Sequence, residues 1–249
     1  MNHADKQAPV ALITGAGRRI GASIADFLQQ KGYRVIVHYN QSERAAQSLV
    51  SRLNKIKPDS AKLLSANLTD KNNVNTLIMD ALEWGDRLDA LVNNASIFKK
   101  TEFDQINDQD WDDLFNTNVK APLWLSHACY PYLAKSNGAI INITDIHADK
   151  PLKNYAVYCQ SKAALNMQTK ALALEFAPHV RVNAVAPGAI IWPEDENILS
   201  KNQKDKIITK TPLQVHGQPI YIAQGVLTLL ENPFITGQIL RVDGGRSIV

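Results

Sequence analysis

A tyrosine and a lysine four residues apart, Tyr158 and Lys162, are the residues of this sequence best suited to moving a proton. At that spacing the two side chains lie on one face of a helix. A lysine ammonium beside the phenol would lower the tyrosine pKa, so that the pair could exchange a proton near neutral pH. Because such pairs are also usual on solvated helix faces, the interpretation depends on where the pair stands in the chain.

A glycine-rich turn near the start of the chain supplies that context. The apolar run 10–14 leads into Gly15-x-Gly17-x-x-x-Gly21, and a helical pattern follows. Glycines there permit a tight turn and let backbone amides approach a pyrophosphate at the N-terminus of the helix. The spacing departs from G-x-G-x-x-G, and glycines can simply mark a turn. Their position between the first strand and the first helix of a βαβ unit nevertheless predicts a dinucleotide site.

The end of the second predicted strand indicates which dinucleotide is bound. An NAD site normally has Asp or Glu there for the ribose 2′-hydroxyl. This chain has no acid at that place, where the residues are Tyr39, Asn40, Gln41 and Ser42. Arg18 in the glycine turn, together with these amide and hydroxyl donors, would hold a 2′-phosphate. NADPH is therefore favoured over NADH; the alternative is a plain strand-to-helix turn with Ser42 as N-cap.

Alternating apolar and amphipathic runs predict the elements that position these residues. Strands are expected at 10–14, 33–39, 61–66, 88–93, 139–144, 180–186 and 238–243, and helices at 20–31, 43–54, 72–84, 109–134, 154–177 and 219–231. This order predicts one α/β domain over residues 1–249, a doubly wound Rossmann fold with a parallel sheet between two helical layers. The polar, irregular segment 191–214 is predicted to be a mobile substrate flap, or a surface insertion.

Composition narrows the classes of partner. The chain has 249 residues, 45% hydrophobic and 20% charged, and its net charge of +3 is too small and scattered to indicate nucleic acid. It has no signal-peptide run and no stretch long enough to span a membrane, so a cytoplasmic protein is expected. The two cysteines and six histidines show no ligand spacing, and no metal site is expected.

Several motifs in a fixed order carry a family resemblance. They are Thr14–Gly21, Asn93-Asn94-Ala95, Asn118, the Tyr158/Lys162 pair, Pro187-Gly188 and Val242-Asp243-Gly244-Gly245. With them the chain resembles the short-chain dehydrogenase/reductase family over essentially its whole length. The resemblance implies hydride transfer assisted by the tyrosine and lysine, with Asn118 supporting the lysine, and commonly a homotetramer. The cofactor-binding residues that it implies, together with the turn residues above, are Gly15, Gly17, Arg18, Arg19, Ile20, Gly21, Tyr39, Asn40, Gln41, Ser42, Asn67, Leu68, Asn94, Ala95, Ser96, Pro187 and Gly188.

Two departures from the general family pattern indicate a branch within it. Position 19 usually holds glycine and here is Arg19, and the usual catalytic serine is replaced by Asp145. Both substitutions resemble the pteridine reductases, and in that branch a phenylalanine at the place of Phe98 packs the pterin against the nicotinamide. Taken alone, Phe98 would be read as core or flap packing, Asp145 as a turn residue and Arg19 as a surface residue. Trp192 could wall the pocket or anchor the flap.

The predicted function is reduction of a dihydropterin, or a dihydrofolate-type substrate, by NADPH. A flat pterin can stack on Phe98, and its ring edge can meet the Arg19 guanidinium. An acid pair made of Asp145 and Tyr158 suits delivery of a proton to a ring nitrogen. The catalytic residues are therefore predicted to be Asp145, Tyr158, Lys162 and Asn118, and the substrate-binding residues Arg19, Phe98, Asp145 and Tyr158. The alternatives are a carbonyl reductase, for example of a 3-oxoacyl thioester, and a nonenzymatic NADPH-binding sensor.

Overall fold

A parallel seven-stranded sheet forms the centre of the protein. The computed structural model describes residues 8–192 and 198–249. The strands are β1 (Val10–Ile13), β2 (Arg34–Tyr39), β3 (Ala61–Ser65), β4 (Ala90–Asn93), β5 (Ala139–Ile143), β6 (Arg181–Pro187) and β7 (Ile239–Val242). Their spatial order is β3-β2-β1-β4-β5-β6-β7, and every pair of neighbours is parallel. The order reverses between β1 and β4, the place where doubly wound sheets bind ligands. The predicted fold class is confirmed.

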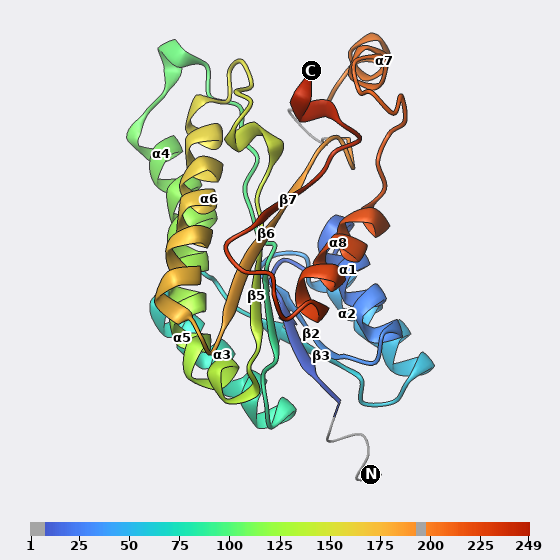
Figure 1. Ribbon diagram of the computed structural model, residues 1–249, viewed down its shortest axis with the longest axis vertical. Helices are drawn as coiled ribbons and strands as arrows, with labels where there is room; N and C mark the ends of the chain where they lie inside the picture. The colour runs from blue at the N-terminus through green and yellow to red at the C-terminus, as the bar shows by residue number, and fades with distance from the viewer. Residues whose placement is uncertain (1–7, 193–197) are drawn as a thin grey trace.

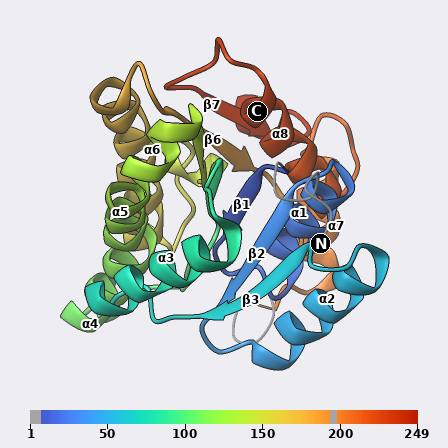
Figure 2. The same ribbon diagram turned by 90° about the horizontal axis from the view of Figure 1, so that it is seen from below.

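Helices cover both faces of the sheet (Figures 1 and 2). One layer contains α1 (Arg19–Gln30), α2 (Glu43–Ile56) and α8 (Pro219–Glu231), and the other contains α3 (Lys71–Gly85), α5 (Ala121–Ser136) and α6 (Ala156–Phe176). Strand β1 illustrates how the layers are held. Its alternate residues Ala11 and Ile13 pack into the core beneath the first layer, and Val10 and Leu12 into the core beneath the second. Burial on both faces explains why the strands are continuously apolar.

The helix predicted over 109–134 is three consecutive elements. These are α4 (Asp108–Phe115), a π-helical turn η3 (Asn116–Lys120) and α5, which has a proline at its start. Pro122 has no N–H to donate to the carbonyl four residues earlier, which is that of Asn118. A local change to wider hydrogen bonding at this point is the usual consequence.

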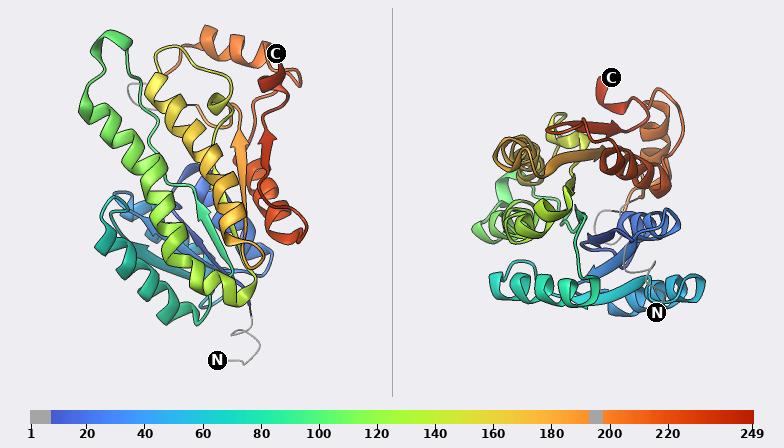
Figure 3. Two further views of the ribbon diagram at one scale, coloured as in Figure 1. Left: turned by 60° about the vertical axis from the view of Figure 1, so that its left-hand side comes forward. Right: turned by 60° about the horizontal axis from the view of Figure 1, so that its bottom comes forward.

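The segment 191–214 was predicted to be irregular, but it contains the helix α7 (Lys201–Thr209). Ser200 and Gln203 form a reciprocal capping box that starts this helix. Residues 193–197 of the predicted flap lie outside the described residues. Helix α7 lies at the same end of the molecule as the carboxyl ends of the strands, the top of Figure 1 and of the left panel of Figure 3.

Candidate active site

Thr14 joins the glycine turn after β1 to the loop after β4. Its Oγ1 accepts hydrogen bonds from the backbone N–H groups of Asn94 and Ala95, both at 3.0 Å. The Asn94 side-chain amide in turn donates to the carbonyls of Thr14 (2.8 Å) and Gly15 (3.1 Å). The sequence-predicted cofactor residues of the two loops are therefore brought together at the switch point of the sheet.

This contact explains two of the glycines. Gly15 has φ +60°, and a Cβ there would lie 2.9 Å from the Cα of Ala95. A Cβ on Gly21 would lie 2.5 Å from the Asn94 amide nitrogen, closer than any side chain tolerates. The glycine spacing thus lets two loops approach each other as well as leaving room for a ligand.

His38 on β2 fixes the same turn and was missed by the sequence analysis. Its Nδ1 accepts from the N–H of Gly15 (3.1 Å), so its Nε2 carries the proton and donates to the carbonyl of Ala66 (3.1 Å). Burial lowers the pKa of His38 from 6.5 to about 4, so the ring stays neutral at physiological pH. The sequence signal that could have identified His38 is a polar residue inside an otherwise apolar, buried strand.

Polar side chains predicted to bind the cofactor stand at the glycine turn and at the end of β2. Arg18 is the exposed N-cap residue of α1, and Asn40 and Gln41 are exposed at the end of β2. Ser42 belongs to the same cluster, because a Cβ on Gly17 would lie 2.6 Å from its Oγ. Tyr39 is half-buried beside them. This donor set, which lacks a carboxylate, has the chemistry that a phosphorylated ribose requires.

The remaining predicted cofactor residues stand around this turn with mixed exposure. Asn67 is exposed at the end of β3, where its Oδ1 accepts from the N–H and hydroxyl of Thr69, and Leu68 is buried in the core. Ser96 is exposed after Ala95. Gly188, which follows Pro187 at the end of β6, packs so closely on Asp243 that a Cβ would lie 2.7 Å from it.

Asp145, Tyr158 and Lys162 meet beyond the end of β5. The Tyr158 hydroxyl donates to Oδ2 of Asp145 at 2.7 Å, while Oδ1 of Asp145 accepts from the N–H of His147 at 2.8 Å. Asp145 is therefore both a turn-capping residue and the partner of the tyrosine. The Lys162 amine donates to the carbonyl of Ile143 at 3.0 Å and lies 5.8 Å from the centre of the Tyr158 ring.

The pKa of Tyr158 is shifted in the direction opposite to the predicted one. Burial, the negative charge of Asp145 and the hydrogen bond to that carboxylate raise the pKa of Tyr158 well above 10. Burial also lowers the pKa of Lys162 from 10.5 to about 8, and the charge of Asp145 partly opposes this. The expected lowering is wrong because the spacing of two residues reveals neither their burial nor the carboxylate that is hydrogen-bonded to the phenol. The phenol is thus held in its protonated form.

Asn118 is a buried link between elements. Its Oδ1 accepts from the N–H of Ile97 (2.8 Å), and its amide donates to the carbonyl of Ile97 (3.0 Å) and to Oγ of Ser161 (3.0 Å). It therefore fixes the loop after β4 to helix α6 next to Lys162. Ser161 is a second residue that the sequence analysis did not single out.

Phe98 packs against the acid pair, whereas Arg19, the first residue of α1, reaches the start of the segment 191–214. The Phe98 ring stacks on Tyr155 at 4.6 Å and meets Tyr158 edge-on at 4.8 Å. Arg19 has φ +57°, in the left-handed region, and its guanidinium donates to the carbonyl of Trp192 at 3.2 Å. The Trp192 ring stacks on His216 at 4.2 Å. Arg19 therefore connects the glycine turn to the start of the flap segment.

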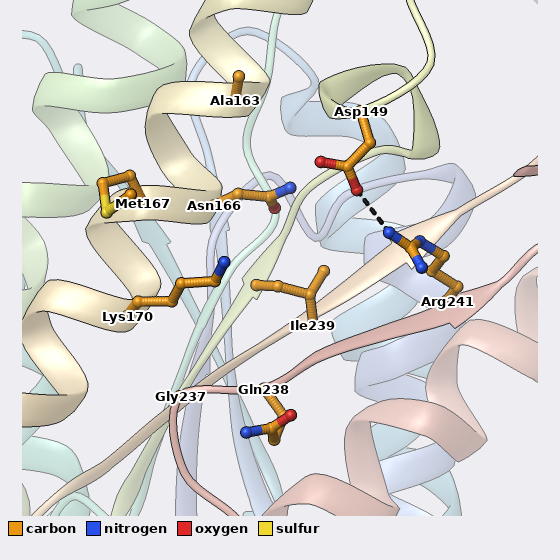
Figure 4. Close-up of a pocket in the computed structure, with 9 residues that line it drawn as sticks. All are labelled: Asp149, Ala163, Asn166, Met167, Lys170, Gly237, Gln238, Ile239 and Arg241. Atoms are coloured by element: carbon orange, nitrogen blue, oxygen red, sulfur yellow. Dashed lines mark hydrogen bonds and ion pairs between the residues drawn. The ribbon is translucent and has the colours of Figure 1, made fainter.

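A polar groove of about 400 Å³ lies elsewhere, between α6 and β7, and contains none of the predicted site residues (Figure 4). Within the described parts of the chain, no group of three or more His, Cys, Asp or Glu residues could hold a metal ion. None of the helices described is both long and apolar enough to cross a membrane.

Comparisons with known proteins support a reductase. A family model described as enoyl-(acyl carrier protein) reductase matches residues 15–247. A 3-oxoacyl-(acyl-carrier-protein) reductase, FabG, of Staphylococcus aureus is 35% identical over 244 residues, 96% of this chain and 98% of its own. Pteridine reductase 1 of Leishmania tarentolae is 33% identical over 284 residues, 97% of each chain. The names of the relatives thus divide between two kinds of substrate at similar identity.

Proposed function

The chain belongs to the short-chain dehydrogenase/reductase family, and we propose that it is an NADPH-dependent reductase converting a dihydropterin to its tetrahydro form. Family membership makes it an oxidoreductase that uses a nicotinamide dinucleotide. The choice of pterin and of NADPH is argued from the side chains of the site.

The carrying observation is the hydrogen bond from the Tyr158 hydroxyl to the Asp145 carboxylate, 2.7 Å long. A carbonyl substrate needs a hydrogen-bond donor at its oxygen, a role that a serine hydroxyl fills. A carboxylate cannot donate unless it is protonated, but it can accept from the N–H groups that line the edge of a pterin. The phenol can meanwhile relay a proton toward a ring nitrogen. The residue pair therefore suits a nitrogen heterocycle better than a ketone.

Phe98 and Arg19 support the same substrate class. Phe98 offers a ring surface within 4.8 Å of the Tyr158 ring, and a planar heterocycle gains from stacking on such a surface. Arg19 holds a left-handed backbone conformation that costs a residue with a side chain roughly 1–2 kcal/mol. Strain of this kind persists at functional sites, where the side chain compensates for it by contacts elsewhere. A planar guanidinium can bind both a phosphate and the edge of a pterin.

The cofactor proposal depends on the donor cluster of Arg18, Asn40, Gln41 and Ser42. When bound, NADPH supplies the hydride. The chain would hold the pyrophosphate at the glycine turn and the 2′-phosphate on the donor cluster. Lys162, fixed on the carbonyl of Ile143, would supply positive charge and a proton to the phenol.

The test is NADPH oxidation by the purified protein with dihydropterins, dihydrofolate, simple ketones and an acetoacetyl thioester. We expect the highest kcat/KM with a dihydropterin. Phe98→Ala should weaken pterin binding by roughly 1–3 kcal/mol, the scale of aromatic stacking on a base, and Phe98→Leu less. Asp145→Ser should lower pterin turnover without a matching loss on carbonyl substrates. A protein that ignores pterins and folates but reduces the thioester would overturn the pterin assignment.

A 3-oxoacyl thioester reductase is the second candidate, because the family model and the Staphylococcus aureus relative carry acyl-carrier-protein reductase names. If that activity dominates, Asp145→Ser should increase thioester reduction, since it restores a neutral hydroxyl donor beside Tyr158. If the pterin activity dominates, the same variant should lose it. One substitution thus separates the two candidates.

We also propose a cytoplasmic homotetramer, as is common in this family. Strand β7 forms an unpaired edge of the sheet, and helix α6 exposes Met167 and Leu174, whose exposed fractions are 63% and 82%. Apolar side chains at this level of exposure are suited to burial between subunits. Light scattering coupled to size exclusion should give four times 27.6 kDa; a monomer mass would contradict this.

A further inference from the structure

The last seven residues of the chain, Asp243–Val249, form a tight turn at the end of the molecule where the catalytic residues lie (Figure 1, red). The Asp243 carboxylate holds the turn by accepting from the N–H groups of Gly245 (3.0 Å) and Ser247 (2.7 Å). Gly244 and Gly245 have φ +65° and +86°, which only glycine adopts without strain. Residues 243–249 therefore have a defined conformation, and we call them the C-terminal turn.

The C-terminal turn reaches the flap helix through Arg246. The guanidinium Nη1 of Arg246 donates to the carbonyl of Ile207, in the last turn of α7, at 3.2 Å. The same carbonyl accepts from the Thr211 hydroxyl at 2.9 Å, and a cation at the C-terminal end of a helix is favoured by the helix dipole. Beside it, the N–H of Leu213 donates to the carbonyl of Gly244 at 3.1 Å. Two contacts thus join the C-terminal turn to the flap segment.

The same turn is tied to the loop that carries Asp145. The Lys150 amine donates to the carbonyl of Arg246 at 3.0 Å and also to the carbonyl of Val249. Lys150 is fixed to the Asp145 loop, because its N–H donates to the carbonyl of Ile146 at 3.0 Å. Arg246 therefore makes both connections. Its carbonyl accepts from Lys150, and its guanidinium donates to a carbonyl of α7.

Electrostatics links Arg246 to the acid pair as well. Partial burial lowers the pKa of Arg246, and the negative charges of Asp145 and Asp243 oppose that shift. The positive charge of Arg246 thus interacts with the carboxylate that accepts the Tyr158 hydrogen bond.

We propose that Arg246 is a positioning residue that braces helix α7 against the Asp145 loop and so fixes the substrate side of the site. Its effect on turnover depends on the proposed function, but the brace itself does not. Arg246 acts through α7 and Asp145 and is not assigned a contact with the reacting atoms.

Three variants test the brace in the full-length protein. Arg246→Met removes the charge and the hydrogen bond, and Arg246→Lys keeps the charge and one donor. The matched control is Arg52→Met, because Arg52 on α2 forms an exposed ion pair with Asp26 on α1 at 2.8 Å, and neither residue belongs to α7 or to 146–150. Amide hydrogen exchange is measured over α7 and over residues 146–150, with α3 as the internal reference.

For Arg246→Met we expect exchange to accelerate about tenfold in α7, as for loss of one charge-assisted hydrogen bond, with α3 unchanged. The acceleration in 146–150 should be smaller, because Lys150 still donates to the main-chain carbonyl of residue 246. Arg246→Lys should recover part of the protection and Arg52→Met should retain all of it. With the best reducible substrate, KM should rise more than kcat falls in Arg246→Met, and Arg246→Lys should reverse part of that rise.

Two outcomes would overturn the brace: unchanged exchange in α7, or equal acceleration in α3, which would indicate general destabilisation. If Arg246→Met does not fold, Arg246→Lys is measured in its place. Its partial loss of exchange protection must then appear both in α7 and in 146–150. Coupled deprotection of those segments in a protein that reduces no pterin would support the brace and refute the pterin function. The two proposals can therefore fail separately.

Discussion

At the cofactor end of the site, side chains bond to main-chain atoms of the glycine turn and of the loop after β4, whereas at the substrate end separate elements meet through contacts between side chains. Thr14, Asn94 and His38 bond to main-chain atoms of adjacent strands in a fixed register. Asp145, Phe98 and Tyr158 come from different loops and a helix, and touch one another only through side chains. A main-chain atom is present whatever the residue type, so one partner of each cofactor-end contact is kept when residues change, which suits a shared reaction. Side-chain contacts change with single substitutions, so the substrate end can vary while the fold persists.

The largest expected effect is that of removing the Tyr158 hydroxyl, which should impair the substrate end of the site and leave the cofactor end intact. Tyr158→Phe should lower turnover by about 10²-fold or more, because a proton-transfer group is lost. NADPH affinity, measured by fluorescence titration, should stay within about twofold, since no cofactor-end contact described above involves Tyr158. The phenylalanine ring keeps the edge-on packing with Phe98, so the fold should be intact. Near-normal turnover in this variant would remove the tyrosine from the mechanism.

The same division explains what could be predicted from sequence. The strands were predicted well because burial on both faces leaves a continuous apolar run, and the glycine turn because its conformation is local. His38 was missed because its partners, Gly15 and Ala66, are brought together only by the pairing of β2 with its neighbours. The predicted direction of the Tyr158 pKa shift was wrong because the burial of the phenol and its hydrogen bond to Asp145 are properties of the folded chain.

Helix α7 and the split of the long helix show a second limit. The capping box at Ser200 and Gln203 was readable in the sequence, but the charged, proline-bounded context favoured a loop. The π-helical turn at Asn118 lies just before Pro122, a visible signal, but the hydrogen bonds from Asn118 to Ile97 and Ser161 are invisible without the fold. Local rules therefore give the elements, and long-range contacts decide where elements bend.

The second prediction tests whether the cofactor end is pinned by a neutral histidine. In the unfolded chain His38 takes up a proton near pH 6.5, but in the folded protein only near pH 4. Its contribution to the free energy of unfolding is thus fully present above about pH 6.5 and is lost as the pH falls toward 4, by up to about 3 kcal/mol. Urea unfolding of the wild type and of His38→Gln at several pH values measures this.

The wild-type curve should fall more steeply below pH 6.5 than the His38→Gln curve. His127→Gln is the matched control, because His127 is exposed on α5 and this variant should keep the wild-type slope. Parallel curves for wild type and His38→Gln would contradict the buried neutral ring.

The third prediction sharpens cofactor choice within the cofactor end. Arg18→Ala should raise KM for NADPH about tenfold, as expected for one charge-assisted contact, and change KM for NADH little. The control is Arg52→Ala, whose guanidinium pairs with Asp26 on the neighbouring helix. Kinetics with both cofactors are run at one ionic strength, because salt screens exposed charges. Equal kcat/KM for NADH and NADPH in the wild type would refute the cofactor assignment.

The smallest expected change in stability concerns Arg19, the residue that connects the two ends. In Arg19→Gly, glycine relieves left-handed strain of roughly 1–2 kcal/mol, but its unfolded chain is more flexible by roughly 0.5–1 kcal/mol. The hydrogen bond to the carbonyl of Trp192 is also lost. The free energy of unfolding should therefore change by less than about 1 kcal/mol, while pterin kcat/KM falls about tenfold or more. Asn137→Gly, with φ +50° at the end of α5, is the control for backbone relief and should retain full activity. If Arg19→Gly kept full pterin activity, the left-handed arginine would have no role in binding the substrate, and the link between the two ends would be structural alone.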